Sequence, residues 1–474
     1  MYGCSGRAAD PFEACAAHLT PLQLRRFAAG LGPGADLDLR GVTVAPGLLA
    51  SLLEAVTGPD GRARLGRCRF EGALLPAQVS FARTCFERDC SFDGAAFVGG
   101  VSFFDARFGG HVSFRGTRFA GNATFHGASF GRHASFEEAV FGGDALFGET
   151  AWGAGAVFDR AVFLEAVAFD KARFGQDAMM RAACFGGAYS FRRVQVGRHA
   201  RFERARFRHG LRLGPMAAAG RIDLADVTVH GDLHVHAAVR RITARGLTVH
   251  GSGEFRLRHT ELDLEGAAFE GELAVRSLAQ PLTGVTEPDD PDGPRARLAS
   301  LRGVSARDVV LTDVDLTRCR FAGLRGPDDP ASGGLRLSGH CAFGTVRPRW
   351  HRHGHAVLAE DPAAAGGLSD ERLAVLYGRL ARAAAGSDGR LARDFRYSAL
   401  EMRRRTEPGR WRRWLLHALW LTCGYGLRAG RGVVVVGVLV ALACCVVSLA
   451  RHGGHQTSAH SRPAAPSTLP VHER

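Results

Sequence analysis

The chain has 474 residues, 11 cysteines and a formal net charge of +14 at pH 7. This length allows two or three domains. The scattered cysteines indicate no disulfide framework and favour a reduced, cytosolic setting. Thirty Phe against five Tyr is an unusual balance, and most of these Phe residues lie in one repeating segment.

The sequence predicts a helical or irregular N-terminal segment over residues 1–36. The stretch from Met1 to Pro33 lacks the continuous apolar region of a signal peptide. Leu37 to Val44 alternates apolar and polar residues, which is typical of a strand. We therefore expect the repeating structure to begin at residue 37.

From Phe70 to Leu213 an apolar residue, usually Phe, recurs at alternating intervals of five and six residues. An α-helix of about 3.6 residues per turn cannot place all of these on one face, so the pattern predicts one unit stacked on copies of itself. A small residue two positions before each Phe of the first series also points inward, as alternation along a strand requires. The structural ladder includes Phe81, Phe92, Phe114, Phe125, Phe136 and Phe158 in the first series and Phe119, Phe130, Phe141 and Phe163 in the second.

Glycine follows many second-series residues, among them Gly153, Gly175 and Gly197. We expect a turn with unusual backbone angles at this position, because glycine tolerates such angles best.

The spacing resembles the pentapeptide-repeat family, whose coils form a right-handed, four-sided β-helix with a large residue at the centre of each repeat. Val309 to Gly323 is nearer the usual repeat of five. The resemblance implies an all-β, right-handed quadrilateral β-helix over residues 37–324. Within it we expect 22-residue coils built from the 11-residue repeats at 70–213, 20-residue coils at 222–281, a loop at 282–297 and the last repeats at 298–324.

Residues 325–368 predict an irregular linker. His351, His353 and His355 could converge on one metal ion along an extended strand, but no Cys or acidic residue at ligand spacing completes a site. A solvated basic loop is the expected interpretation, and metal binding there is left open.

Residues 369–428 predict a helical hairpin followed by an interfacial segment. Ser369 can cap a helix with an apolar stripe, a Gly-rich turn follows at 386–389, and a second amphipathic helix comes after it. Residues 412–421 are basic, aromatic and apolar, as interfacial helices are. Leu376-Tyr377, Glu401 to Arg404 and Gly424 to Arg428 resemble the C-terminal module of membrane-anchored bacterial pentapeptide-repeat proteins, mostly actinobacterial.

Residues 432–450 are uncharged and largely apolar, which predicts one transmembrane helix, followed by a disordered tail at 451–474. Residues 347–431 carry 17 Arg against 8 acidic residues. Basic residues stay on the cytoplasmic side, so we expect single-pass placement in the inner (cytoplasmic) cell membrane, with the solenoid in the cytoplasm and the tail outside. The membrane-proximal basic cluster is Arg403, Arg404, Arg405, Arg412, Arg413, Arg428 and Arg431.

These features favour a non-enzymatic, membrane-tethered interaction scaffold. The chain has no nucleophile elbow, phosphate-binding glycine loop or zinc-protease motif, so we expect no catalytic residue, no cofactor and no metal. The expected partners are the lipid bilayer and an unidentified protein; nucleic acid is not expected, and homo-oligomerisation is left open.

Two alternatives remain. Soluble relatives in the family imitate DNA and bind topoisomerases, but they do so with acidic surfaces, whereas Phe70 to Leu213 carries 18 basic and 14 acidic residues. The other alternative is an accessory subunit of a membrane complex. Gly432 and Gly437 are five apart, so a GxxxG helix-pairing motif is absent.

Overall fold

The structure is a computed structural model that describes residues 4–288, 293–325, 334–346, 355–362, 367–427 and 429–453. The chain divides into two compact units. The first comprises Met1–Leu368 and Arg379–Ala392, and the second comprises Ser369–Gly378 and Arg393–Arg474.

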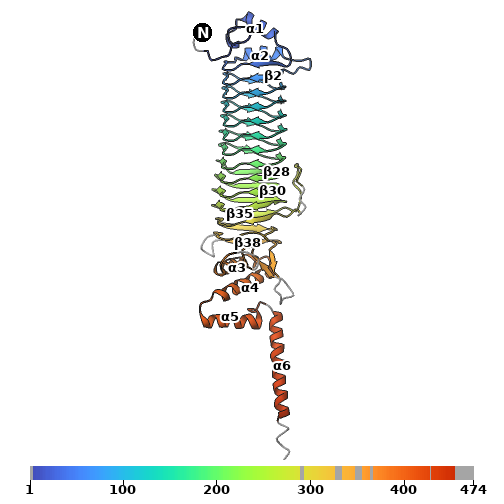
Figure 1. Ribbon diagram of the computed structural model, residues 1–474, viewed down its shortest axis with the longest axis vertical. Coiled ribbons are helices and arrows are strands. Elements are labelled where there is room, and N and C mark those ends of the chain that lie inside the picture. Colours follow the sequence, from blue (N-terminus) through green and yellow to red (C-terminus); the bar gives the residue numbers. More distant parts are fainter. Residues whose placement is uncertain are drawn as a thin grey trace, which may run out of the picture. The chain divides into compact units, whose positions relative to one another are not determined.

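A small N-terminal cap precedes the repeats. It contains the 3-10 turn η1 (Ala16–His18), α1 (Pro21–Ala29), β1 (Ala35–Asp38) and α2 (Pro46–Ala55), and leads into β2 (Arg64–Arg69). Thr20 and Gln23 form a reciprocal capping box that begins α1. Figure 1 shows α1 and α2 at one end of the stacked coils. The cap thereby covers the first strands, whose open edge would otherwise be free to pair with another chain.

Each coil of the Phe-rich region contains four short strands, and each strand pairs in parallel with the equivalent strand of the next coil. The first side is a 10-stranded sheet. Its strands are β3 (Leu74–Leu75), β7 (Ala96–Phe97), β11 (Arg118–Phe119), β15 (Val140–Phe141), β19 (Val162–Phe163), β23 (Cys184–Phe185), β27 (Arg206–Phe207), β29 (Thr228–Val229), β31 (Thr248–Val249) and β34 (Ala268–Phe269).

The second side is a 6-stranded sheet. Its strands are β4 (Val79–Ser80), β8 (Val101–Ser102), β12 (Ala123–Thr124), β16 (Ala145–Leu146), β20 (Val167–Ala168) and β24 (Tyr189–Ser190).

The two remaining strands of each coil belong to one large sheet. One series is β5 (Cys85–Phe86), β9 (Arg107–Phe108), β13 (Ser129–Phe130), β17 (Ala151–Trp152), β21 (Arg173–Phe174) and β25 (Gln195–Val196). The other is β6 (Cys90–Ser91), β10 (Val112–Ser113), β14 (Ala134–Ser135), β18 (Ala156–Val157), β22 (Ala178–Met179) and β26 (Ala200–Arg201).

Later coils have longer strands in the same large sheet. They are β28 (Leu211–Asp223), β30 (Leu233–Thr243), β32 (Gly253–Arg258), β33 (Glu261–Asp263), β35 (Glu272–Ser277), β36 (Arg297–Ser300), β37 (Asp308–Thr312) and β38 (Leu335–Ser338). An antiparallel pair, β39 (Gly344–Val346) and β40 (His355–Val357), follows them.

The pairing register measures the coil length directly. Phe97 pairs with Phe119, a step of 22 residues, and Val229 pairs with Val249, a step of 20 residues. These steps equal the two coil lengths that the sequence predicts. The chain therefore contains a β-solenoid with two coil lengths.

The core is the aromatic ladder. The ten ladder phenylalanines named from the sequence are each at most 1% exposed. Residues one coil apart lie face to face, as Phe86 and Phe108 do with ring centroids 4.6 Å apart and planes 2° from parallel. Neighbours within a coil meet edge to face, as Phe125 and Phe136 do at 5.3 Å. Both arrangements are favourable for aromatic rings.

The left-handed backbone angles occur at a different position from the expected one. They fall two residues after each first-series Phe, where non-glycine residues such as Arg83, Glu149 and Lys171 have φ between 57° and 60°. Gly153, Gly175 and Gly197 are not among the positive-φ residues. They are required for space instead, because a Cβ on Gly197 would lie 2.1 Å from the carbonyl oxygen of Gly175 in the preceding coil.

The C-terminal helices are α3 (Asp370–Ala384), α4 (Gly389–Thr406), α5 (Arg410–Cys423) and α6 (Ala429–Gly453). In the second unit, Tyr377 contacts Phe395 with ring centroids 6.0 Å apart. The indole Nε1 of Trp420 donates a hydrogen bond to the Tyr397 hydroxyl at 3.2 Å.

The expected transmembrane helix requires correction. Over the residues that the structure describes, no helix combines the length and the apolar character needed to cross a membrane. A crossing takes about 20 consecutive apolar residues. The expected transmembrane segment at 432–450 was wrong, and so was the single-pass placement in the cell membrane that depended on it.

Candidate functional site

One side of the solenoid carries no charged side chain on its strands. In five strands of the 6-stranded sheet the first side chain is buried and the second points outward, whereas both residues of β24 are half-buried. We call the outward residues the uncharged face; they are Ser80, Ser102, Thr124, Leu146, Ala168 and Ser190. These side chains are small or apolar, so the surface needs little dehydration before a partner can contact it.

Large apolar side chains are exposed on and beside the uncharged face. Leu146 is 42% exposed, and Phe104, two residues beyond β8, is 45% exposed. Val98 and Leu164, at the corner before the same sheet, are 52% and 53% exposed. The ring of Phe104 stacks on His126 of the next coil at 5.9 Å. Clustered exposed apolar side chains are typical of interaction sites, whereas single ones are ordinary.

A different side of the same coils is bordered by charged residues, although the outward residues of its strands are Ser113, Ser135, Val157 and Met179. Beyond the β10–β14–β18–β22 strands, ion pairs connect successive coils. Arg160 contacts Glu137 at 2.6 Å, and Arg181 contacts Asp159 at 2.5 Å. The Arg160 side chain is half exposed, so its ion pair contributes little to stability, whereas the Asp159 carboxylate is buried against Arg181. The ion pairs keep that side hydrated. A comparable pair, Lys171 with Glu149 at 2.6 Å, lies beyond β16 and β20, so the uncharged face differs chiefly in its exposed apolar side chains.

A groove of about 490 Å³ lies over the glycine column Gly153, Gly175 and Gly197. A loop closes its other side through Thr286, Glu287 and Pro288. Glu287 holds the loop, because its carboxylate accepts hydrogen bonds from Arg258 Nε at 2.8 Å and from the Leu282 amide at 2.6 Å. The charged residues that line the groove are Arg173 and Glu287, so it offers chiefly backbone and small side chains to a ligand.

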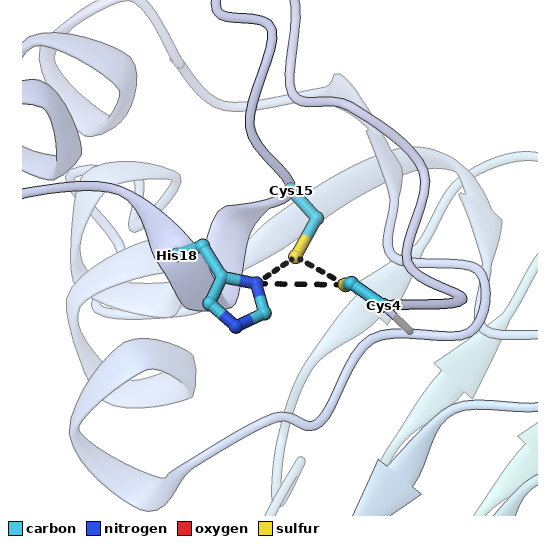
Figure 2. Close-up of side chains that lie close together, drawn as sticks. All are labelled: Cys4, Cys15 and His18. Carbon is cyan, nitrogen blue, oxygen red and sulfur yellow. Dashed lines mark hydrogen bonds between the residues drawn. The ribbon is translucent and has the colours of Figure 1, made fainter. Parts of the chain in front are cut away.

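A cluster that the sequence analysis missed lies in the N-terminal cap. Figure 2 shows the side chains of Cys4, Cys15 and His18 pointing toward one another. Burial and the neighbouring Cys4 thiol raise the pKa of the Cys15 thiol. The short spacing Cys15-x-x-His18 was the available sequence signal, but Cys4 is eleven residues from Cys15, and no common motif links them.

The arginines of the predicted basic cluster have different surroundings. Arg403, Arg405, Arg412 and Arg413 are exposed. Arg404 instead pairs with Glu401 and lies over the Trp420 ring at 5.2 Å. Burial raises the pKa of Glu401, but hydrogen bonds and charge from Arg404 outweigh it, so the net pKa is lowered. Arg428 and the Arg431 side chain lie outside the described part of the chain.

The predicted histidine tract is only partly described. His355 begins β40, whereas His351 and His353 lie outside the described residues. Metal binding by this tract therefore stays a hypothesis that rests on the sequence.

Comparison with known proteins agrees with the stacked coils. Residues 81–129 and 103–151 match the family model described as pentapeptide repeats (9 copies). No curated protein and no solved structure matches the chain. The match covers residues 81–151, so these coils are similar to pentapeptide repeats, and the register shows that the stack they belong to is a β-solenoid. The match supports neither membrane anchoring nor an actinobacterial origin.

Proposed function

We propose that this protein is a non-enzymatic interaction scaffold whose solenoid presents the uncharged face to a protein partner. The observation that carries the proposal is the gathering of Val98, Phe104, Leu146 and Leu164 around one sheet. Of the large hydrophobic side chains exposed in the described coils between Phe70 and Leu213, Leu74 is the remaining member, and it lies on the neighbouring 10-stranded sheet.

The partner's chemistry follows from the surface. An interface core is typically depleted of charged residues and enriched in apolar ones. The uncharged face meets that description, whereas the ion-paired side would have to lose the hydration of Arg160, Glu137 and their neighbours on binding.

The rigidity of the stack favours binding as well. The four inner strands of the uncharged face are each hydrogen-bonded to a strand on both edges, as β12 is to β8 and β16. A surface that is already ordered loses little conformational entropy on association, so more of the contact energy remains as affinity.

The test places a photo-crosslinking amino acid at single positions in the full chain, in the organism that makes it. Ser102 and Leu146 probe the uncharged face, and Ser113 and Ser135, the outward residues of β10 and β14, are matched positions on the charged side. We expect one discrete protein adduct from the first pair and none from the second.

A substitution series completes the test. Leu146→Arg should abolish the adduct formed at Ser102, and Ser135→Arg should leave it unchanged. Equal crosslinking on both sides, or an adduct that survives Leu146→Arg, would contradict the proposal.

A further inference from the structure

Three soft metal-ligating atoms converge in the N-terminal cap. The Cys4 and Cys15 sulfurs are 3.4 Å apart. Nδ1 of His18 lies 3.0 Å from the Cys15 sulfur and 3.5 Å from the Cys4 sulfur. Two separate segments of the backbone between residues 4 and 18 bring these three atoms together.

The first piece is the turn that carries Cys15 and His18. Cys15 precedes η1, and the His18 amide donates to the Cys15 carbonyl at 2.8 Å. Residues three apart in a 3-10 turn lie almost above one another, which brings the thiol and the imidazole to the same side.

The second piece is the segment that delivers Cys4. The Ser5 hydroxyl donates to the Gly41 carbonyl at 3.0 Å, and the Arg7 amide donates to the Arg40 carbonyl at 3.0 Å. Ala8 then forms an antiparallel bridge with Cys15. The segment is thus held against both the first coil and the turn.

Gly6 permits the close approach. A Cβ at Gly6 would lie 2.9 Å from Cys15 Cβ and 3.1 Å from Val42 Cγ2. The Gly6 amide also donates to the Cys4 sulfur at 3.4 Å, an interaction that stabilises a thiolate.

The dimensions suit zinc. With Zn–S bonds of about 2.3 Å and Zn–N bonds of about 2.0 Å, tetrahedral angles place two sulfurs about 3.8 Å apart and a sulfur and a nitrogen about 3.5 Å apart. The observed edges differ from these by a few tenths of an ångström. Two thiolates balance the charge of a divalent ion, and Cys and His together suit zinc better than magnesium or calcium, which prefer oxygen.

We propose that Cys4, Cys15 and His18 bind one zinc ion that fastens the N-terminal segment to the cap of the solenoid. Cys15 is buried and anchors the ion from the protein side, whereas Cys4 and His18 are exposed and leave the fourth position to solvent. The ion joins residue 4 to the turn beside α1, so its role is to close the end of the stack. Each thiol that binds the ion releases one proton, so affinity falls as pH falls.

The test measures metal in the full chain purified under reducing conditions. Elemental analysis should find one zinc per chain, and cobalt(II) added to the stripped protein should produce thiolate-to-cobalt charge-transfer absorption. Cys4→Ser and His18→Ala should each weaken zinc binding by about 100-fold or more, since even outer-shell changes cost about 10- to 100-fold. Cys85→Ser, at the partly exposed sulfur of β5, is the matched control and should bind zinc like the parent chain.

The Gly6→Ala variant tests the geometry of the site without removing a ligand. It removes no ligand but displaces Cys4 from Cys15, so zinc affinity should fall by about 10-fold or more. A circular dichroism spectrum like that of the parent would show that the solenoid remains folded in each variant.

Three results would overturn the proposal. The first is a reduced chain that takes up neither zinc nor cobalt(II). The second is metal content that Cys4→Ser and His18→Ala leave unchanged. The third is a Cys4–Cys15 disulfide as the form present in the cell, detected by mass spectrometry after alkylation at the moment of lysis.

Discussion

The ring of Phe130 lies flat against the indole of Trp152 one coil further along, with centroids 4.0 Å apart and planes 6° from parallel. The indole Nε1 donates to the Thr150 hydroxyl at 2.9 Å, and that hydroxyl donates to the Phe147 carbonyl at 2.7 Å. A buried indole N–H needs such a partner. The ladder therefore accepts Trp at this rung because the small position beside it is Thr.

The first prediction concerns the ladder itself. Phe136 is fully buried between Phe114 and Phe158, at ring distances of 4.7 and 4.9 Å. Phe136→Ala should lower the free energy of unfolding by about 3–5 kcal/mol, because it removes a large apolar contact and leaves a cavity. Denaturant unfolding followed by circular dichroism measures this. Ser135→Ala, next to it but outward, should change stability by less than about 0.5 kcal/mol.

The second prediction concerns the glycine column. Gly197→Ala would place a Cβ 2.1 Å from the Gly175 carbonyl oxygen, so the coils must separate locally. We expect a loss of about 1–3 kcal/mol in the free energy of unfolding, the usual cost of overpacking. At Gly155 the nearest atom to an added Cβ is 3.5 Å away, an ordinary contact. Equal losses for Gly197→Ala and Gly155→Ala would show that the close approach is unimportant.

The third prediction concerns the left-handed turn residues. Ala182 has φ of 54° and is exposed, so its Cβ strains the backbone without contributing to the core. Ala182→Gly should raise the thermal midpoint, because relief of about 1–2 kcal/mol of left-handed strain exceeds the entropic cost of glycine, about 0.5–1 kcal/mol. The neighbouring Ala183 is buried, and Ala183→Gly should lower the midpoint. A lower midpoint for both variants would contradict this account.

The fourth prediction is a pH dependence at the cap. Hydrogen bonds from Arg40 lower the pKa of Asp38, and Arg7 lies 3.4 Å away. Since the folded pKa lies below the unfolded one, the stabilisation is present above about pH 3.9, the ordinary Asp value. It is lost as pH falls through the folded pKa. Asp38→Asn should therefore be less stable than the parent near neutral pH, and the gap in unfolding midpoint should close in acid. A gap that stays constant from neutral to acid pH would refute the ion-pair explanation.

Much of the solenoid was predictable because its core repeats. Alternation along a strand predicts which side chains point inward, and the five-and-six spacing predicts coils of 22 residues, which the pairing of Phe97 with Phe119 matches. The outward position of Leu146 follows from the same alternation. Aligning the repeats would have shown which outward residues lie above one another on each side of the solenoid.

The glycines were misread because sequence does not separate two uses of glycine. The sequence predicts left-handed turns at Gly175 and Gly197, but there the close approach of the preceding coil leaves no room for a Cβ, and Arg83 and Lys171 adopt the left-handed angles instead. The apolar run at 432–450 was also over-interpreted, since hydrophobic length alone led to a membrane prediction that the described helices do not support.

The sequence by itself determined the stacked coils and their aromatic core, because strand alternation and a fixed repeat are local properties that need no knowledge of distant contacts. The tertiary structure decided which side chains come into contact across turns and loops. It brought Cys4 beside Cys15 and His18 through contacts with Gly41, and it folded the loop at Glu287 over the glycine column. These contacts depend on the path of irregular backbone. That path does not repeat along the sequence, so it cannot be predicted from a period.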